Sequence, residues 1–206
     1  MKIGKHRKFF FLQSAAFWAL AVCFSTLLIP AADGKINIGD KMADFTLKDV
    51  GGDAYSLYQL KGKNATVAIF IATQCPYSNA FNQTMEKLYE DYQGRGVGFI
   101  GINANKTEPA AEVASHAKAK GLKFLILKDE GSVIANRLGA RVTPEVFLLD
   151  SNMILKYHGA VGNSKNPTTN SQLATSDEAK AALESVLSGN PVQVAVTRAF
   201  GCTIKR

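Results

Sequence analysis

The pattern of hydrophobic and polar positions predicts strands that alternate with helices in the middle of the chain. Three short apolar runs have the length and the β-branched and aromatic content of buried strands. These runs are residues 67–72, 97–103 and 124–127. Helical spacing or helix start and stop signals follow them, after Pro76, at 108–120 and at 132–138. This alternation is typical of an α/β layered domain.

Turn residues predict two hairpins that extend the sheet. Residues 44–48 and 55–57 flank a Gly-Gly-Asp turn, and residues 146–149 and 154–157 flank an Asp-Ser-Asn turn. An added hairpin makes the central sheet mixed, with parallel and antiparallel strands. We therefore expect one α/β domain, with a three-layer fold and a mixed sheet, over residues 36–160.

The segment 161–206 differs in composition from the predicted domain. Residues 162–175 are rich in Asn, Ser, Thr and Pro, and we interpret them as a polar surface loop. Thr175-Ser-Asp-Glu178 has the spacing of a capping box and predicts a last helix through Leu187. In the tail that follows, residues 192–196 alternate Val with other residues, so they either pair as an edge strand or lie extended.

The first 32 residues have the layout of an export signal. A basic start precedes an apolar run over residues 9–29, and Ala31 and Ala32 follow it. The run is nearly long enough to span a bilayer, which takes about 20 residues. Residues 1–32 are therefore either a cleaved signal peptide or an uncleaved membrane anchor. Both alternatives place the protein in the periplasm or another extracytoplasmic compartment.

Charge gives no support for nucleic-acid binding. The net charge of the chain is +7, but residues 1–32 hold four basic residues and no acidic one. Subtracting them from the 24 basic residues leaves 20 against 17 acidic residues, which is a net charge of +3. No basic stripe with interleaved aromatic residues is present. We expect no nucleic-acid partner.

Cys75 stands at the most informative position in the sequence. It follows the apolar run 67–72, and Pro76, a residue favoured at the first position of a helix, comes directly after it. The free N–H groups and the dipole at the start of a helix stabilise negative charge. A thiol in that place favours the thiolate form, which is the nucleophile in cysteine chemistry. The alternative is a small buried cysteine without reactivity.

Cys202 is the other cysteine outside the first 32 residues. One pair so far apart in the chain is not the disulfide framework of a small secreted domain. Cys202 either pairs with Cys75 or is an idle thiol in a mobile tail. His116 and His158 have no ligand spacing with each other or with Cys75, so we predict no metal, and nothing in the sequence indicates another cofactor.

The segments around Cys75 and around Val142-Thr-Pro-Glu-Val-Phe-Leu-Leu-Asp150 resemble the thioredoxin-like superfamily. The resemblance is strongest to its redoxin or peroxiredoxin-like branch, which includes alkyl hydroperoxide reductase and thiol-specific antioxidant proteins. It implies a reactive Cys75, with Pro76 beside it, and a cis peptide before Pro144 facing the thiol. Thr143 would then offer its backbone to an extended substrate segment. The ending Gly-Cys-Thr-Ile-Lys is similar to that of some exported redoxin-like proteins.

The sequence departs from the family pattern at two points. Dithiol members have a second cysteine where this chain has Ser78, and a serine cannot displace a partner from a mixed disulfide. Cys202 is then the candidate for that step. Peroxiredoxins carry Pro and Thr seven and three residues before the reactive cysteine, and this chain has Ala68 and Ala72 there.

Three functions follow from these features. The first is an exported thiol–disulfide oxidoreductase that acts through Cys75, with protein or small-molecule thiols and disulfides as substrates and an external dithiol as electron donor. The second is a peroxiredoxin-like enzyme that reduces peroxides. The third is a non-catalytic module that binds a peptide along the groove at Thr143 and Pro144.

Overall fold

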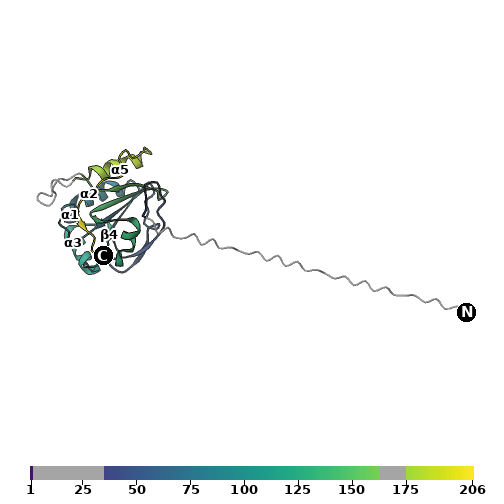
Figure 1. Cartoon of the computed structure of the whole chain (residues 1–206), viewed down its shortest axis with the longest axis horizontal. Coiled ribbons are helices and arrows are strands. Elements are labelled where there is room, and N and C mark those ends of the chain that lie inside the picture. Colours follow the sequence, from purple (N-terminus) through teal and green to yellow (C-terminus); the bar gives the residue numbers. More distant parts are fainter. Residues whose placement is uncertain (2–34, 163–174) are drawn as a thin grey trace. The chain divides into compact units, whose positions relative to one another are not determined.

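The computed structural model describes Met1, residues 35–162 and residues 175–206 (Figure 1). The chain divides into Met1–Ala32 and Asp33–Arg206, and the fold described below is that of the second unit. The predicted signal peptide or anchor at 1–32 and most of the predicted polar loop at 162–175 lie outside the described residues.

Helices and strands alternate through most of the second unit. The strands are β1 (Thr46–Asp49), β2 (Ala54–Ser56), β3 (Ala65–Ile71), β4 (Val97–Asn103), β5 (Leu125–Lys128), β6 (Val142–Thr143), β7 (Glu145–Asp150), β8 (Leu155–Gly159) and β9 (Cys202–Thr203). The helices are α1 (Pro76–Ala80), α2 (Asn82–Gln93), α3 (Ala110–Lys120), α4 (Val133–Leu138) and α5 (Asp177–Leu187), and a 3-10 turn, η1 (Glu130–Ser132), precedes α4.

The central sheet has seven strands in the order β2-β1-β5-β4-β3-β7-β8. Strands β3, β4 and β5 run parallel, whereas β7 pairs antiparallel with β3, and the hairpins β1–β2 and β7–β8 form the two edges. The prediction of an α/β fold with a central mixed sheet is confirmed. The parallel strands are connected through α1 and α2 and through α3, as the apolar runs separated by helical segments indicated.

Each face of the sheet has its own core. Side chains of β3 alternate between the faces, because successive residues of a strand point in opposite directions. Val67, Ile69 and Ile71 pack on one face with α2 and α5, whereas Ala68 and Phe70 pack on the other with α4 and the segment before β3. Helices or chain segments therefore cover both faces, which gives the three layers.

The helix expected after Pro76 is interrupted. α1 ends at Ala80 and α2 begins at Asn82, with Phe81 between them at φ −90° and ψ −3°. The Phe81 N–H donates to the carbonyl oxygens of Tyr77 and Ser78, which tightens the last turn of α1. The apolar spacing of the sequence continues through this break and did not indicate it.

The tail after α5 lies across the domain. The backbone bends at residues 193–194, and a single bridge joins Val196 to His158, so residues 192–196 neither form a strand nor lie extended. β9 pairs antiparallel with β6 in a second, two-stranded sheet. The sequence did not predict β6 or β9. At the start of α5 the cap is Ser176 and no side chain caps the helix, so the capping box expected from Thr175 is wrong.

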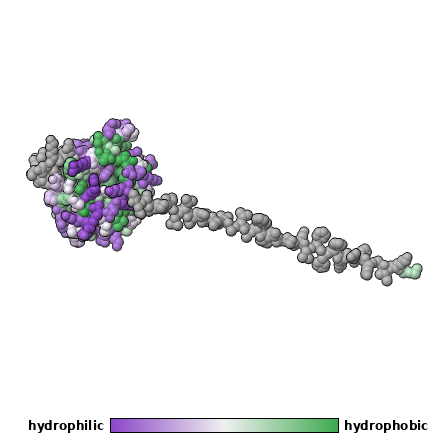
Figure 2. Space-filling view, viewed as in Figure 1, coloured by the Kyte–Doolittle hydropathy of each residue, from purple (hydrophilic) through white to green (hydrophobic). Residues whose placement is uncertain are grey.

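On the face that Figure 2 shows, most of the described residues are hydrophilic. Figure 2 shows hydrophobic residues gathered where Figure 1 places α5. In residues 35–162 and 175–206, no helix is long and apolar enough to cross a membrane.

Candidate functional site

Cys75 caps the N-terminus of α1 at the end of the turn that follows β3. Its backbone is extended, Pro76 takes the first helical position, and the Ser78 N–H donates to the Cys75 Sγ over 3.4 Å. An N–H that donates to sulfur binds a thiolate more strongly than a thiol. The expected strand, turn and helix arrangement around Cys75 is therefore present, with one backbone amide at the sulfur.

Ser78 stabilises this turn. Its side chain is fully buried, and its Oγ accepts the Ala72 N–H at 3.0 Å. The hydroxyl thereby ties the first turn of α1 to the end of β3. This contact gives Ser78 a structural role in place of the second cysteine of dithiol proteins.

Thr143 and Pro144 lie opposite Cys75. The peptide bond between them is cis, as the resemblance implied, and the Cys75 Sγ donates to the Thr143 carbonyl oxygen at 3.2 Å. Thr143 is 1% exposed, whereas Pro76 is exposed at the outer side of the turn. Among the predicted site residues, Cys75, Thr143 and Pro144 therefore meet at one place.

Cys202 completes this group of residues. β9 places Cys202 directly opposite Thr143 in antiparallel register, and the Cys75 Sγ lies 3.2 Å from the carbonyl oxygen of the same Thr143. Burial, followed by interaction with Cys75, raises the pKa of the Cys202 thiol to about 11. Interaction with the Tyr77 backbone acts to lower this pKa. The structure thus brings together the two thiols that the sequence separates by more than a hundred residues.

The strand edge at Thr143 is occupied by the chain's own tail. We expected it to pair with a substrate segment, and in the structure β9 takes that place. Gly201 permits the approach, since an added Cβ would lie 1.9 Å from the Thr143 carbonyl oxygen. The tail also explains why Cys75 is only 2% exposed, although its position at a turn suggested an accessible thiol. Cys202 itself is half-buried.

The residues after Cys202 fix the tail to the domain. The Ile204 N–H donates to the Arg141 carbonyl oxygen at 3.0 Å, and the Ile204 side chain is buried in the core around α4. The Lys205 N–H donates to Asn105 Oδ1 at 2.7 Å, and the Arg206 side chain binds the Ala140 carbonyl oxygen. These contacts attach the tail on the C-terminal side of Cys202 to the domain.

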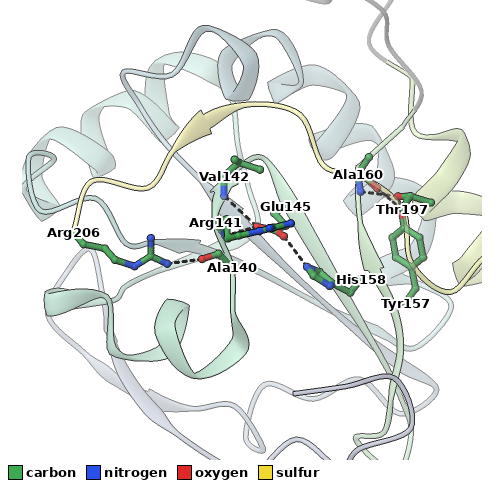
Figure 3. A network of polar contacts seen from close by, with 9 residues as sticks. All are labelled: Ala140, Arg141, Val142, Glu145, Tyr157, His158, Ala160, Thr197 and Arg206. Atoms are coloured by element: carbon green, nitrogen blue, oxygen red, sulfur yellow. Dashed lines mark hydrogen bonds and ion pairs between the residues drawn. The ribbon is translucent and has the colours of Figure 1, made fainter. Parts of the chain in front are cut away.

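A buried carboxylate, Glu145, supports the strand that pairs with β9 (Figure 3). Its Oε2 accepts the N–H groups of Arg141 and Val142 at 2.6 and 3.1 Å, and its Oε1 lies 2.6 Å from His158 Nε2. Burial alone would raise the pKa of Glu145, but the hydrogen bonds from His158 and from the two amides outweigh it and lower the pKa. Glu145 therefore holds β6 in place as an ionised group.

A second buried carboxylate, Glu108, joins the two thiol-bearing segments. Its Oε2 and Oε1 accept the N–H groups of Thr73 and Gln74 at 2.9 and 3.0 Å, directly before Cys75. Its Oε1 also accepts Asn105 Nδ2 at 2.9 Å, and Asn105 in turn holds Lys205 of the tail. Burial acts to raise the pKa of Glu108, but these backbone and amide donors lower it overall.

The sequence did not single out Glu108 or Glu145. The residue type alone does not show whether a glutamate is solvated or buried, and only its neighbours in the sequence can indicate burial. For Glu145 a signal existed, since it stands between Pro144 and the apolar run of β7, where an acidic side chain needs partners. Glu108, next to Pro109 at a helix start, carried no such signal.

His116 and His158 contact residues other than the two cysteines. His116 Nε2 is 3.3 Å from Asn82 Nδ2, and burial lowers the pKa of His116. His158 stacks on Phe147 with ring centroids 4.3 Å apart and contacts Glu145. Among residues 35–162 and 175–206, no three His, Cys, Asp or Glu side chains form a group suited to a metal ion.

The fold and this site define a thioredoxin-like protein with two facing thiols at a cis-proline. The AhpC/TSA family model matches residues 38–158. The match covers more than half of the chain, and the chain belongs to the AhpC/TSA family. The predicted membership of the redoxin branch is confirmed.

Relatives of known class share this segment. Thiol-disulfide oxidoreductase ResA of Halalkalibacterium halodurans is 34% identical over 121 residues, which are 58% of this chain and 67% of the relative. Peroxiredoxin Q, chloroplastic, of Oryza sativa subsp. japonica is 28% identical over 134 residues, which are 60% of this chain and 59% of the relative. The chain thus spans about three fifths to two thirds of the length of these relatives.

Solved structures resemble a larger part of the chain. A hypothetical protein from Sinorhizobium meliloti is 32% identical with a TM-score of 0.77, and the match covers 84% of this chain and 96% of that one. A protein assigned as thiol:disulfide interchange protein DsbE from Chlorobium tepidum is 19% identical with a TM-score of 0.58, covering 72% and 99%, and shares the fold. The first match covers more of the chain than residues 38–158, so the shared architecture extends beyond the family segment.

Proposed function

We propose that the protein is a thiol–disulfide oxidoreductase of redoxin type, with Cys75 as the nucleophile and Cys202 as the second thiol. The observation that carries this proposal is the placement of both cysteines against Thr143, beside the cis-proline. Relatives named as thiol-disulfide oxidoreductases support the same activity. The chemistry takes place between these two sulfurs and the sulfurs of the substrate and donor, and it involves no metal or organic cofactor.

The reaction follows from ordinary thiol–disulfide exchange. The tail first leaves the Thr143 edge, which uncovers Cys75. The Cys75 thiolate then attacks one sulfur of a substrate disulfide, forms a mixed disulfide and releases the first substrate thiolate. The Cys202 thiolate then attacks the Cys75 sulfur, which forms the Cys75–Cys202 disulfide and releases the second substrate thiolate. The substrate gains two electrons and the protein loses two. An external dithiol donor returns these electrons and restores both thiols.

Two serine variants test the assignment of the cysteines. Cys75→Ser is expected to abolish the acceleration that the protein gives to the reduction of oxidised glutathione by dithiothreitol, because the nucleophile is lost. Cys202→Ser is expected to lower this acceleration at least tenfold. With oxidised glutathione and no dithiothreitol, the same variant should accumulate a glutathione adduct on Cys75, since no second thiol resolves it. Mass spectrometry of the non-reduced protein measures both the adduct and the Cys75–Cys202 link in the wild type.

The outcomes separate the proposal from its rivals. A wild-type protein that never forms the Cys75–Cys202 link after treatment with oxidised glutathione would show that Cys202 is not the second thiol. Full function in Cys75→Ser would favour the peptide-binding module. As the control for folding, the midpoint temperature of thermal unfolding is measured for each variant and should match that of the wild type.

Peroxide reduction is the second candidate, and the similarity to peroxiredoxin Q favours it. It predicts a sulfenic acid on Cys75 after exposure to hydrogen peroxide. Ala68 and Ala72 stand where peroxiredoxins carry Pro and Thr, so the family's peroxide site is incomplete. Stopped-flow measurement decides this point, since consumption of hydrogen peroxide no faster than by free cysteine removes the candidate.

Export is also part of the proposal. The basic start, the apolar run at 9–29 and the small residues Ala31 and Ala32 support a signal peptide or an N-terminal membrane anchor. An extracytoplasmic compartment suits a protein that cycles between dithiol and disulfide. Cell fractionation, with mass spectrometry of the N-terminus of the isolated protein, distinguishes a cleaved signal from a retained anchor and from a cytoplasmic protein.

A further inference from the structure

The tail restricts how an external molecule reaches the two sulfurs. Cys75 is 2% exposed, and the β9 strand lies along the Thr143 edge that would otherwise lead to it. Cys202 is carried on that strand and is half-buried. Any thiol that approaches from solvent while the tail is in place therefore meets Cys202 before Cys75.

The tail is held on both sides of Cys202, so this cover is part of the fold. Before it, Thr197 Oγ1 accepts the Ala160 N–H at 3.0 Å and lies 2.7 Å from the Tyr157 hydroxyl oxygen (Figure 3). After it, Ile204 is buried and Lys205 is hydrogen-bonded to Asn105. Opening a path to Cys75 means breaking these contacts, whereas a path to Cys202 leaves them intact.

The chemistry of the leaving group favours the same direction. In exchange, attack on one sulfur of a disulfide expels the other as a thiolate, and a thiolate that its surroundings stabilise leaves faster. Attack on Cys202 expels Cys75, whose sulfur accepts the Ser78 N–H. Attack on Cys75 would expel Cys202, whose pKa is raised to about 11, chiefly by burial.

We propose that Cys202 is the sulfur that the external dithiol donor attacks, and that Cys75 is the leaving group of this step. The inference deepens the proposed function and rests on it, since it concerns the resetting half of that reaction. The donor thiolate bonds to the Cys202 sulfur, the Cys75–Cys202 bond breaks, and its electron pair stays on Cys75. The second donor thiol then attacks the donor sulfur of this mixed disulfide, which yields the oxidised donor and a Cys202 thiolate that takes up a proton.

Glutathione is the probe for the site of attack. The full-length wild-type protein is oxidised, and the Cys75–Cys202 link is first verified by mass spectrometry. Glutathione is then added, and samples are quenched with acid at millisecond to second intervals and alkylated. Peptide mapping measures glutathione on each cysteine. Extrapolation to zero time removes later transfer of glutathione between the two sulfurs.

At zero time we expect at least ten times more glutathione on Cys202 than on Cys75. Equal amounts, or an excess on Cys75, would overturn the inference while leaving the proposed function intact. Failure to form the internal disulfide in the first step would overturn both, and that result is read before glutathione is added. The two failures are therefore distinguishable in one experiment.

Discussion

Single carboxylates decide how firmly the two thiols are held. Glu108 accepts hydrogen bonds from the turn before Cys75 and, through Asn105, supports the tail that carries Cys202. Glu145 does the same for β6, the strand against which the tail pairs. Neither carboxylate is among the described contacts of the sulfurs, so both are positioning residues. Replacing either carboxylate should destabilise the fold, because the N–H groups that it accepts would be left buried without a hydrogen-bond partner.

Glu108→Gln should destabilise the protein by about 3 kcal/mol, because the new amide group faces N–H donors where an oxygen accepted them. Both carboxylate oxygens of Glu108 accept two donors each, so neither orientation of the glutamine avoids the conflict. Urea unfolding measures the change. Glu108 also orients Asn105, which binds Lys205 of the tail. The substitution should therefore weaken the hold on the tail and lower the equilibrium yield of the Cys75–Cys202 disulfide in a glutathione redox buffer.

Glu112→Gln is the matched control for this variant. Glu112 Oε1 accepts the Thr73 hydroxyl at 2.8 Å and the Gln74 side-chain amide at 3.1 Å, on a partly exposed helix surface. A glutamine oxygen can replace it, and we expect a change below about 1 kcal/mol. Equal effects of the two substitutions would show that burial of Glu108 does not matter as argued.

At the scale of elements, the site depends on β9, which carries Cys202, and the sequence did not predict this strand. The strand, turn and helix around Cys75 could be predicted because each leaves a periodic or capping signal. A two-residue strand such as β9 leaves none, and its partner β6 is equally short. The contact of Cys202 with Cys75 could be raised only as one alternative, since pairing of distant segments depends on packing that no local pattern records.

Gly201→Ala should detach β9 from β6. The added Cβ would lie 1.9 Å from the Thr143 carbonyl oxygen, a backbone atom that cannot move aside easily. We expect the Cys75 thiol to react with iodoacetamide at least ten times faster, because its cover is lost. We also expect a lower yield of the internal disulfide at equilibrium.

Gly94→Ala is the control for this substitution. Gly94 has φ −70°, and a Cβ there would meet nothing within 4 Å. Alkylation of Cys75 in this variant should match the wild type. An unchanged alkylation rate in Gly201→Ala would mean that the tail does not shield Cys75.

At the scale of the whole molecule, the buried carboxylates make stability depend on pH. Glu108 and Glu145 have pKa values below their ordinary value of 4.5 in the folded state. A depressed pKa contributes stability that is present above the unfolded value and lost as pH falls through the folded one. Asp129 acts in the opposite direction, because burial raises its pKa.

We therefore expect the free energy of unfolding to decrease as pH falls below about 4.5, because three carboxylates with a lowered pKa, Glu108, Glu145 and Glu184, outnumber Asp129. Urea unfolding at a series of pH values between 7 and 3 measures it. The Glu108→Gln variant should lose less stability over this range than the wild type, since one titrating group is gone. A larger loss in the variant would assign the acid sensitivity to other groups.

Because β9 is the last strand in the chain, it is synthesised after the rest of the site. Cys75 and the seven strands of the central sheet are all made before Cys202 leaves the ribosome, and domains begin to fold from their N-terminal side. In a nascent domain, Cys75 therefore stays uncovered and can react with other disulfides until β9 pairs with β6. In chains that end before residue 201, Cys75 should stay uncovered, and these chains should be recovered from cells as mixed disulfides with other thiols.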